Sequence, residues 1–199
     1  MIRICYIVLI SLQSLAGFGQ YKWSLKREEN GIKVYSSSVA GTSLKAIKVD
    51  CTIAGTYTKL ITALTNVPQL KDWIYKAKKT ELIKSTPNNT IYYLVTEMPW
   101  PLSNRDAVIH LHFMTDSLPA FFTVSGSTEP ALVPESSGNV RIKQYKANWK
   151  VTMPTTQTVH IEYTLEVDPG GSVPAWIVNM FVDKGPYESF SKLAEILKR

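Results

Sequence analysis

The segment from Asp168 to the C-terminus places the strongest constraint on the fold. Asp168-Pro169-Gly170-Gly171 ends a strand sharply, because proline cannot donate to a strand ladder and glycine tolerates positive φ. Ser172 is then expected to cap a helix that carries a proline in its first turn, kinks at Gly185-Pro186 and ends near Leu197. Its apolar residues recur at spacings of three and four, allowing for the kink: Ile177, Met180, Phe181, Phe190, Leu193, Ala194 and Leu197. Such a helix needs a large apolar partner.

The preceding sequence supplies an antiparallel sheet as that partner. Residues 44–53 and 157–167 alternate between apolar and polar side chains, which indicates one buried and one solvated face. After a short opening segment at 23–29, further strands are expected at 32–35, 75–85, 90–98, 107–115, 120–127 and 141–153. Short helices are expected at 57–65, with Thr56 as the N-cap, and at 70–73. The predicted fold class is therefore α+β, and 199 residues suffice for one such core rather than two domains.

The N-terminus has the pattern of a secretory signal peptide. A positive charge at Arg3 precedes an apolar run, and the small residues Gly17 and Gly19 follow it. We expect cleavage after residue 19, a mature domain at 20–199, and a periplasmic or secreted location. The alternative is an uncleaved anchor, for which the apolar run is short. The mature chain then keeps a single cysteine, Cys51, which is expected to be a core residue.

The charge of the chain is moderately basic. The formal net charge is +6, of which Arg3 in the signal segment contributes one. This charge is compatible with attraction to an anionic membrane surface but is too diffuse to predict nucleic-acid binding. The sequence contains no Gly-x-Ser-x-Gly elbow, phosphate-binding glycine loop or His-Glu-x-x-His helix. We therefore predict no catalytic residues, no cofactor and no nucleic-acid partner.

Several stretches together resemble the START family of lipid-transfer domains, in the helix-grip (Bet v 1-like) superfamily. The resemblance covers the mature chain and is carried by Trp23 with residues 30–35, Trp73, residues 99–106 (Pro-Trp-Pro-Leu-Ser-Asn-Arg-Asp), Trp149 and residues 168–179. It implies a curved antiparallel sheet wrapped around the terminal helix, with a lipid-sized tunnel between them. The ligand-binding residues expected along that tunnel are Tyr93, Ile109, Leu111, Phe113, Tyr145, Trp149, Ile161, Tyr163, Ile177, Met180 and Phe181.

The sequence departs from the sterol-binding members of that family. Those members carry an arginine and an acidic residue inside the cavity. Aligned through Arg105-Asp106, the arginine position is Leu111, and the acidic position falls near Tyr93 with a one-residue gap. A polar ligand group would have to be met by tyrosine hydroxyls or backbone groups. Sterol specificity is therefore not carried over.

Two polar groupings have a structural and a chemical interpretation. Arg105 and Asp106 are adjacent on a strand and point to opposite faces, so pinning of the proline-rich turn is favoured over catalysis. His110, His112 and His160 could bind zinc together with a carboxylate, but they lie on polar strand faces, and surface histidines without a metal are favoured.

The function predicted from these observations is that of a non-catalytic, monomeric carrier of one hydrophobic molecule, with transient membrane contact near Trp176. The alternative is an enzyme of the helix-grip superfamily, a cyclase or hydrolase acting on a hydrophobic substrate in the same cavity. A structural module with a filled interior comes third.

Overall fold

A computed structural model describes residues 21–39, 44–115, 117 and 120–199 of the chain. The predicted signal peptide at 1–19 lies outside these residues. Within the described part, no helix combines the length and the apolar character that are needed to cross a membrane.

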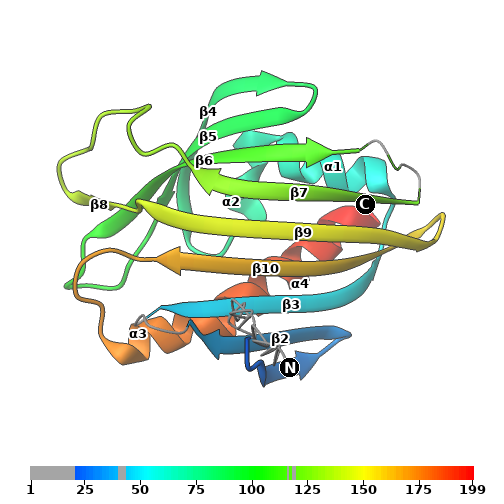
Figure 1. The fold of residues 1–199 in the computed structure, drawn as a ribbon, viewed down its shortest axis with the longest axis horizontal. Helices are drawn as coiled ribbons and strands as arrows, with labels where there is room; N and C mark the ends of the chain where they lie inside the picture. Colours follow the sequence, from blue (N-terminus) through cyan, green and yellow to red (C-terminus); the bar gives the residue numbers. More distant parts are fainter. Residues whose placement is uncertain (1–20, 40–43, 116, 118–119) are drawn as a thin grey trace, which may run out of the picture.

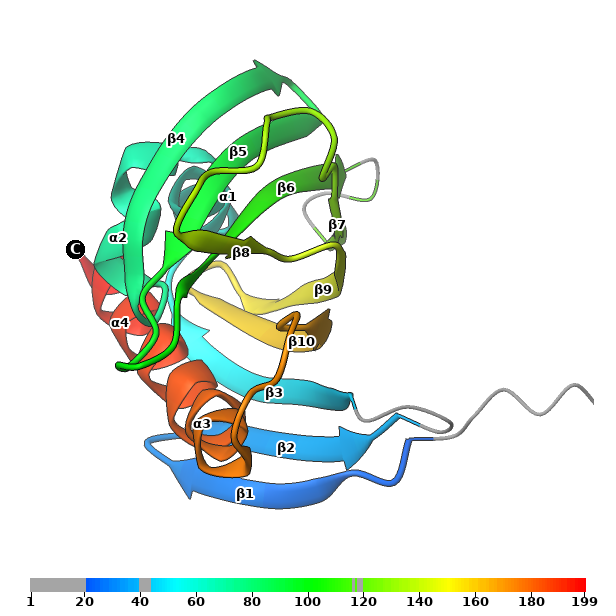
Figure 2. The same cartoon turned by 90° about the vertical axis from the view of Figure 1, so that its left-hand side faces the viewer.

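One strongly curved sheet forms the body of the molecule (Figures 1 and 2). Its strands lie in the order β1-β2-β3-β10-β9-β7-β6-β5-β4, and all neighbours in this order are antiparallel. The short β8 pairs with β6 in parallel. The strand bounds are β1 Ser24–Glu29, β2 Ile32–Ser38, β3 Lys45–Ala54, β4 Ala77–Thr86, β5 Asn89–Thr96, β6 Asn104–Met114, β7 Phe121–Thr128, β8 Asn139–Arg141, β9 Gln144–Thr155 and β10 Thr158–Asp168.

The helices lie on the concave side of the sheet (Figure 2). They are α1 (Tyr57–Thr65), the short 3-10 turn η1 (Val67–Gln69), α2 (Leu70–Trp73), α3 (Ala175–Asn179), a π-helical turn η2 (Met180–Lys184) and α4 (Gly185–Lys198). The Thr56 hydroxyl accepts from the backbone N–H of Lys59, so the predicted N-cap is present. The predicted α+β architecture, a curved sheet that grips a C-terminal helix, is confirmed.

The start of the C-terminal helix differs from the prediction. The helix begins at Ala175 with Pro174 in the N-cap position, and Ser172 lies in the connection before it. The reason is Pro174, because a residue before proline is disfavoured in the α region, and Val173 therefore cannot be the first helical residue. Gly170 and Gly171 both adopt positive φ, at 67° and 63°, which reverses the chain between β10 and α3.

The expected kink is a π-helical turn placed just before Gly185-Pro186. Pro186 has no N–H for the carbonyl of Val182, and its ring crowds that carbonyl, so the regular α-helical ladder is interrupted over Met180–Lys184. The apolar face continues through the irregular turn, since Ile177, Val182, Phe190, Leu193 and Leu197 are all buried.

Three strand bounds are also more precise than predicted or differ from the prediction. Residues 24–29, expected only as a short opening segment, form the edge strand β1, which pairs with β2. Strand β6 begins at Asn104, so Arg105 and Asp106 lie within the strand and not in the connection before it. The expected strand at 141–153 is divided into β8 and β9.

Candidate functional site

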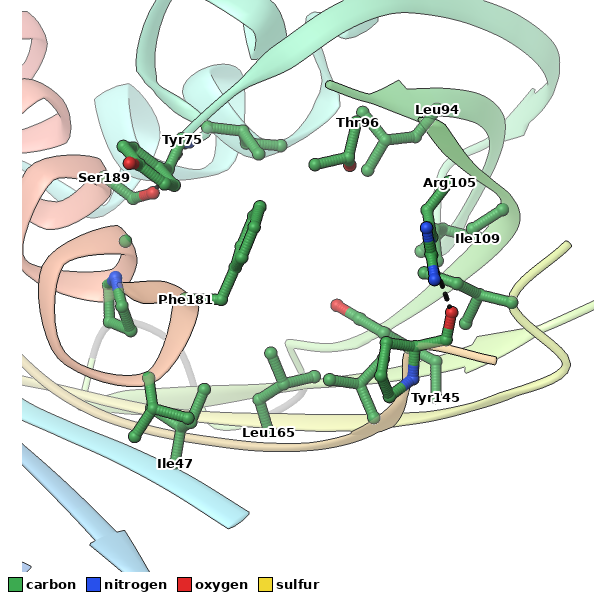
Figure 3. Close-up of a pocket in the computed structure, with 18 of the residues that line it drawn as sticks. Ile47, Tyr75, Leu94, Thr96, Arg105, Ile109, Tyr145, Leu165, Phe181 and Ser189 are labelled. Carbon is green, nitrogen blue, oxygen red and sulfur yellow. Dashed lines mark hydrogen bonds between the residues drawn. The ribbon is translucent and has the colours of Figure 1, made fainter. Parts of the chain in front are cut away.

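A cavity of about 470 Å³ lies between the sheet and the C-terminal helix. Figure 3 shows its labelled side chains surrounding an open space, with Phe181 reaching in from η2 and Ile47 and Leu165 from β3 and β10. Most of the lining side chains are apolar, since β3, β5, β6, β9 and β10 all turn their apolar faces toward the helix. The sheet therefore supplies one wall and the segment from Val173 to Phe190 the other.

Four aromatic side chains close the inner end of this cavity. Trp149 stands at the centre of the group, with ring centroids 4.6 Å from Tyr163, 5.4 Å from Phe190 and 6.5 Å from Trp73. All four are at most 9% exposed. We call Trp73, Trp149, Tyr163 and Phe190 the aromatic wall.

Beyond the aromatic wall the space between sheet and helices is filled. Leu60 of α1 and Leu193 and Leu197 of α4 are at most 1% exposed there and belong to one continuous core with Val151, whereas Leu64 of α1 lines the cavity. Close packing of this kind leaves no room for a ligand. The cavity lies on the other side of the aromatic wall, between the sheet and the start of the C-terminal helix.

The outer end of the cavity is where β6 begins and β10 ends. Arg105 is 4% exposed and donates from Nε to the carbonyl of Pro169 at 3.0 Å, from Nη2 to that of Gly170 at 3.0 Å and from Nη1 to that of Ser103 at 2.6 Å. Burial lowers the pKa of its guanidinium. The three charged residues among the described lining, Lys45, Arg105 and Asp168, all belong to this end, which we call the mouth.

Two exposed tryptophans lie at the same end. Trp176 is on α3 beside the lining residue Ile177, and its side chain is 58% exposed. Trp100 is in the connection between β5 and β6, close to the lining residue Met98, and is 89% exposed. Figure 2 shows this connection close to α3. Large apolar side chains therefore project into solvent beside the mouth.

Three of the four described tyrosines that line the cavity come from the sheet: Tyr92 on β5, Tyr145 on β9 and Tyr163 on β10; the fourth, Tyr75, lies just before β4. Burial raises the pKa of Tyr145 to about 12, although its hydrogen bond with Tyr163 acts in the opposite direction. Burial, the nearby Tyr145 hydroxyl and that hydrogen bond also raise the pKa of Tyr163, and burial with the nearby Tyr145 raises that of Tyr92. All three are neutral hydroxyls at physiological pH. We call them the tyrosine cluster.

Seven of the residues predicted from sequence line the cavity: Ile109, Leu111, Tyr145, Trp149, Tyr163, Ile177 and Phe181. Phe113 and Ile161 do not, because each lies two residues farther from the mouth than the deepest lining residue of its strand, Leu111 on β6 and Tyr163 on β10, in the filled core beyond the aromatic wall. Met180 is half-buried and is not among the lining residues. The role of all these predicted residues in ligand binding stays a prediction.

Tyr93 lies on the opposite face of β5 from the cavity. Its hydroxyl donates to Asp106 at 2.8 Å, whereas its neighbour Tyr92 pairs with Ile109 across the sheet and faces inward. The cause is the one-residue uncertainty in the alignment, since a shift of one position on a strand moves a side chain to the other face. Alternation along β6 places Ile109 and Leu111 on the inner face, but it does not tell which residues of β5 face inward. Tyr92 is recognised as inward-facing from the register, because it pairs with Ile109.

Asp106 points away from Arg105, as expected, and takes part in a buried ion pair. Arg141 donates to both carboxylate oxygens of Asp106 at 3.0 Å, and both residues are at most 5% exposed. The same guanidinium donates to the carbonyls of Pro130, Val133 and Pro134. This pair therefore fastens the loop between β7 and β8 to the outer face of β6, which is a structural role.

The remaining candidate groups have structural surroundings. His110 and His112 both lie against the Asn89 amide oxygen, at 2.8 and 3.0 Å, and His160 lies 3.0 Å from the Thr52 hydroxyl. No cluster of metal-ligating side chains is present among the described residues. Cys51 is 1% exposed in the core, and burial, with a contribution from Asp50, raises the pKa of its thiol to about 12.

Comparison with known proteins gives a consistent result. A family model described as START domain matches residues 10–199. A protein of Pseudomonas aeruginosa of uncharacterised function is 31% identical over 173 residues, which cover 86% of this chain and 84% of that protein. The phosphatidylcholine transfer protein of Mus musculus is 26% identical over 167 residues, covering 82% of this chain and 78% of the relative. Among solved structures, a STAR-related lipid transfer protein from Xanthomonas axonopodis superimposes with a TM-score of 0.80 at 29% identity, covering 89% of this chain and 99% of that chain.

Proposed function

Because this chain belongs to the START domain family, we propose that it binds a single hydrophobic molecule, a lipid, in the cavity and carries it between membranes without catalysis. The family consists of lipid-transfer domains, and one relative is named as a phosphatidylcholine transfer protein. Which lipid this chain carries is a separate question from the family to which it belongs.

The cavity between the sheet and the C-terminal helix is the observation that carries this proposal. Enclosed cavities made by mutation cost about 24 cal/mol per Å³, so about 11 kcal/mol is the upper bound for this cavity of 470 Å³, which is open at its mouth. That is comparable with the whole stability of an ordinary domain. A purely structural protein would gain by filling such a space with side chains. A hydrocarbon ligand fills it instead, at about 0.8 kcal/mol for each buried CH₂ group.

The side chains of the cavity favour a carrier over an enzyme. A general acid or base works best with a pKa near the operating pH. The tyrosine cluster has pKa values shifted upward, with that of Tyr145 at about 12, so its hydroxyls neither gain nor lose a proton readily at neutral pH. The charged lining residues are confined to the mouth, and the Arg105 guanidinium there is held by backbone carbonyls.

Release of the ligand is proposed to occur with the mouth against a membrane. Trp100 and Trp176 project beside the mouth, and indole rings favour the boundary between headgroups and acyl chains. The basic net charge favours an anionic surface. The π-helical turn η2 next to the cavity is an interruption of the helical ladder at which the cover can bend.

Export through the N-terminal segment is part of the same proposal. Cleavage after residue 19 would release a carrier into an aqueous compartment outside the cytoplasm, where lipids need a protein to cross between membranes. N-terminal sequencing of the protein purified from its own cell tests this step. A start at Gln20 supports it, and a start at Met1 contradicts it.

Native mass spectrometry of protein purified from its own compartment tests the carrier function. We expect one lipid per protein molecule, and we expect the lipid-loaded protein to accelerate exchange between donor and acceptor vesicles. Protein that stays ligand-free after exposure to a total lipid extract of the source cell, and that moves no lipid between vesicles, contradicts the proposal.

A further inference from the structure

Arg105 and Arg141 are similarly buried but have different electrostatic surroundings. Arg141 has the Asp106 carboxylate as its counter-ion, and the hydrogen bonds between them raise the pKa of its guanidinium. No carboxylate of the described residues lies within ion-pair distance of Arg105, whose pKa is lowered by burial. Its three acceptors are backbone carbonyls, which carry no net charge. Arg105 is therefore a buried cation without a counter-ion, an unfavourable arrangement that an anionic ligand would relieve.

The guanidinium of Arg105 also keeps two N–H groups for a further partner. A guanidinium has five N–H donors. Nε, Nη1 and Nη2 each donate one hydrogen bond, so one N–H on each Nη atom has no acceptor within the described part of the chain. Arg105 lines the cavity, and Figure 3 shows it beside the open space. Its fork of donors suits the paired oxygens of a phosphate or a carboxylate at the mouth.

Lys45 and Asp168 are the other charged residues of the mouth. Lys45 pairs with Val167 across β3 and β10, so it lies beside Asp168. Neither takes part in an ion pair among the residues that the structure describes: the Lys45 ammonium donates to the Ser38 hydroxyl at 2.8 Å, and the Asp168 carboxylate accepts from the Gly170 N–H at 2.9 Å. Their opposite charges offset one another at longer range, which leaves the mouth with one net positive charge. A ligand group with a single negative charge balances it, whereas Asp168 would repel a second negative charge.

The cavity lining inward of Arg105 is hydrocarbon. Ala107, Ile109 and Leu111 follow Arg105 on the same face of β6, at steps of two residues. The strand from Arg105 to Leu111 spans about 20 Å. An anionic group bound at Arg105 therefore directs the attached hydrocarbon inward, toward the aromatic wall.

From these observations we infer that Arg105 binds the single anionic group, a phosphodiester or a carboxylate, of the lipid that the cavity carries. The inference rests on the proposed function and specifies it further. The head stays at the mouth, and the hydrocarbon runs inward along β6. Because Arg105 also bonds the carbonyls of Pro169 and Gly170, one side chain both shapes the mouth and neutralises the ligand.

Two lipids with the same acyl chains test the assignment. They are 1-palmitoyl-2-oleoyl-phosphatidylglycerol, which has one negative charge, and 1-palmitoyl-2-oleoyl-glycerol, which has none. Each is offered in vesicles to the delipidated parent protein and to Arg105→Gln, and the bound fraction is measured by native mass spectrometry. The cost of removing a lipid from the vesicle is the same for both proteins, so it cancels when their preferences are compared. We expect the preference for phosphatidylglycerol to fall at least tenfold in Arg105→Gln, the value of a hydrogen bond to a charged group. Palmitic acid against its methyl ester repeats the comparison for a carboxylate.

Two further variants decide the matter if Arg105→Gln does not fold, which its melting temperature shows. Arg105→Lys keeps the charge without the fork and should retain only part of the preference. Asp168→Asn keeps an oxygen for the Gly170 N–H but removes the negative charge, so it should raise the preference about 2- to 5-fold. Arg27→Gln is the matched control, because it removes the same charge from the edge strand β1 and does not touch the cavity lining. Its preference should equal that of the parent protein.

Quenching of tryptophan fluorescence tests the orientation of the lipid. When Trp23, Trp100 and Trp176 are replaced by phenylalanine, the two remaining tryptophans, Trp73 and Trp149, both belong to the aromatic wall. Bromine near the methyl end of the acyl chain should then quench more strongly than bromine near the ester. The reverse order would place the head at the inner end and overturn the inference.

The remaining outcomes separate the inference from the proposed function. A preference that is the same in the parent protein and in the Arg105 and Asp168 variants, or that falls equally in Arg27→Gln, overturns the anion site and leaves the carrier function standing. Stabilisation by inorganic phosphate that is lost with Arg105, while the charged lipids show no preference, would assign the site to free phosphate and overturn the inference. Binding of no probe and of no lipid from a total extract contradicts the proposed function itself.

Discussion

The Nε of Arg105 donates to the carbonyl oxygen of Pro169 at 3.0 Å, across a sequence separation of 64 residues. The same guanidinium reaches the carbonyl of Gly170 and that of Ser103. It therefore ties the start of β6 and the connection before it to the turn that launches the C-terminal helix. These segments surround the mouth of the cavity, so one side chain sets their relative position.

Replacement of Arg105 by lysine should loosen the mouth. An ammonium on a flexible stem cannot bond three carbonyls in the fixed directions of a guanidinium, and hydrogen bonds from a charged group contribute about 1.5–3 kcal/mol each. We expect Arg105→Lys to lower the free energy of unfolding by about 2–4 kcal/mol, measured by urea denaturation, and to speed amide hydrogen exchange in residues 169–178. Arg199→Lys, at the exposed C-terminus, is the control. Unchanged exchange in 169–178 would show that Arg105 does not hold this turn.

The buried pair of Asp106 and Arg141 should make stability depend on pH in acid. Burial alone would raise the pKa of Asp106, but the hydrogen bonds from Arg141 and Tyr93 outweigh it and lower the pKa below its ordinary value of 3.8. A lowered folded-state pKa gives stability that is fully present above the unfolded-state pKa and is lost as the pH falls through the folded-state value. The wild-type protein should therefore lose stability steadily below about pH 4.

Asp106→Asn tests that assignment. The variant leaves Arg141 buried without a counter-ion, which we expect to lower stability by about 3–5 kcal/mol at pH 7. Because the asparagine does not titrate, the difference in unfolding free energy between variant and wild type should shrink from pH 6 to pH 2. A difference that stays constant over this range would assign the acid sensitivity to other carboxyls.

The thiol of Cys51 should be unreactive in the native protein. Cys51 is 1% exposed. Burial, and to a smaller extent the negative charge of the nearby Asp50, raises the pKa of its thiol to about 12. The nucleophilic thiolate is therefore scarce at neutral pH. We expect modification by a disulfide reagent such as dithionitrobenzoate to be complete within seconds to minutes in 6 M guanidinium chloride and at least 100-fold slower in buffer. Rapid labelling of the folded protein would contradict the placement of Cys51 in the core.

Trp176 should contribute to membrane contact without contributing to stability. Its side chain is 58% exposed on α3, beside the mouth. Insertion of half an indole into the acyl boundary corresponds to about 1.4 kcal/mol, so Trp176→Ala should reduce binding to anionic vesicles and the rate of lipid transfer by roughly tenfold. Trp100→Ala should act in the same way, because Trp100 projects beside the same mouth.

Leu82→Ala is a control, since Leu82 is 49% exposed on the edge strand β4 and does not line the cavity. Equal transfer rates for all these variants would exclude contact through this end.

The fold could be predicted in outline because its signals are local or periodic. Alternation along β10 and the spacing of Ile177, Phe190 and Leu197 each report on one element, and the turn at Pro169-Gly170 marks where one element ends. The predicted start of the terminal helix was wrong, because two rules compete at Ser172 and Pro174. The restriction that proline places on Val173 prevailed over the capping preference of serine.

The site could be predicted only in part because a cavity is a relationship between elements. Phe113 and Ile161 have the parity of lining residues, but the packing of Trp149 against Phe190 closes the cavity before it reaches them. Similarly, the choice between Tyr92 and Tyr93 depends on the register of β5 against β6, which alternation within β5 does not determine. The depth at which the cavity ends along a strand and the register between strands both depend on contacts between elements. Alternation within a single strand predicts neither of them.

Filling the cavity from the sheet side should separate ligand binding from folding. Leu165 points into the open space from β10, as Figure 3 shows, and it pairs with Ile47 and Ala147 on the neighbouring strands. In Leu165→Trp the larger ring has room to enter that space, so we expect lipid binding to fall at least tenfold while the melting temperature stays level or rises. In a core without a cavity the same substitution would be overpacked and would lower stability by about 1–3 kcal/mol.

Thr164→Trp provides the matched comparison, because adjacent residues of a strand face opposite sides and Thr164 does not line the cavity. It adds a ring of the same size one position away, so lipid uptake from vesicles should match that of the parent protein. Lipid uptake from vesicles of a total lipid extract and thermal unfolding, measured on both variants, decide the matter together. Loss of stability in Leu165→Trp with lipid uptake intact would mean that the ligand lies elsewhere. Loss of uptake with stability retained would place the ligand in the space between β10 and the helix.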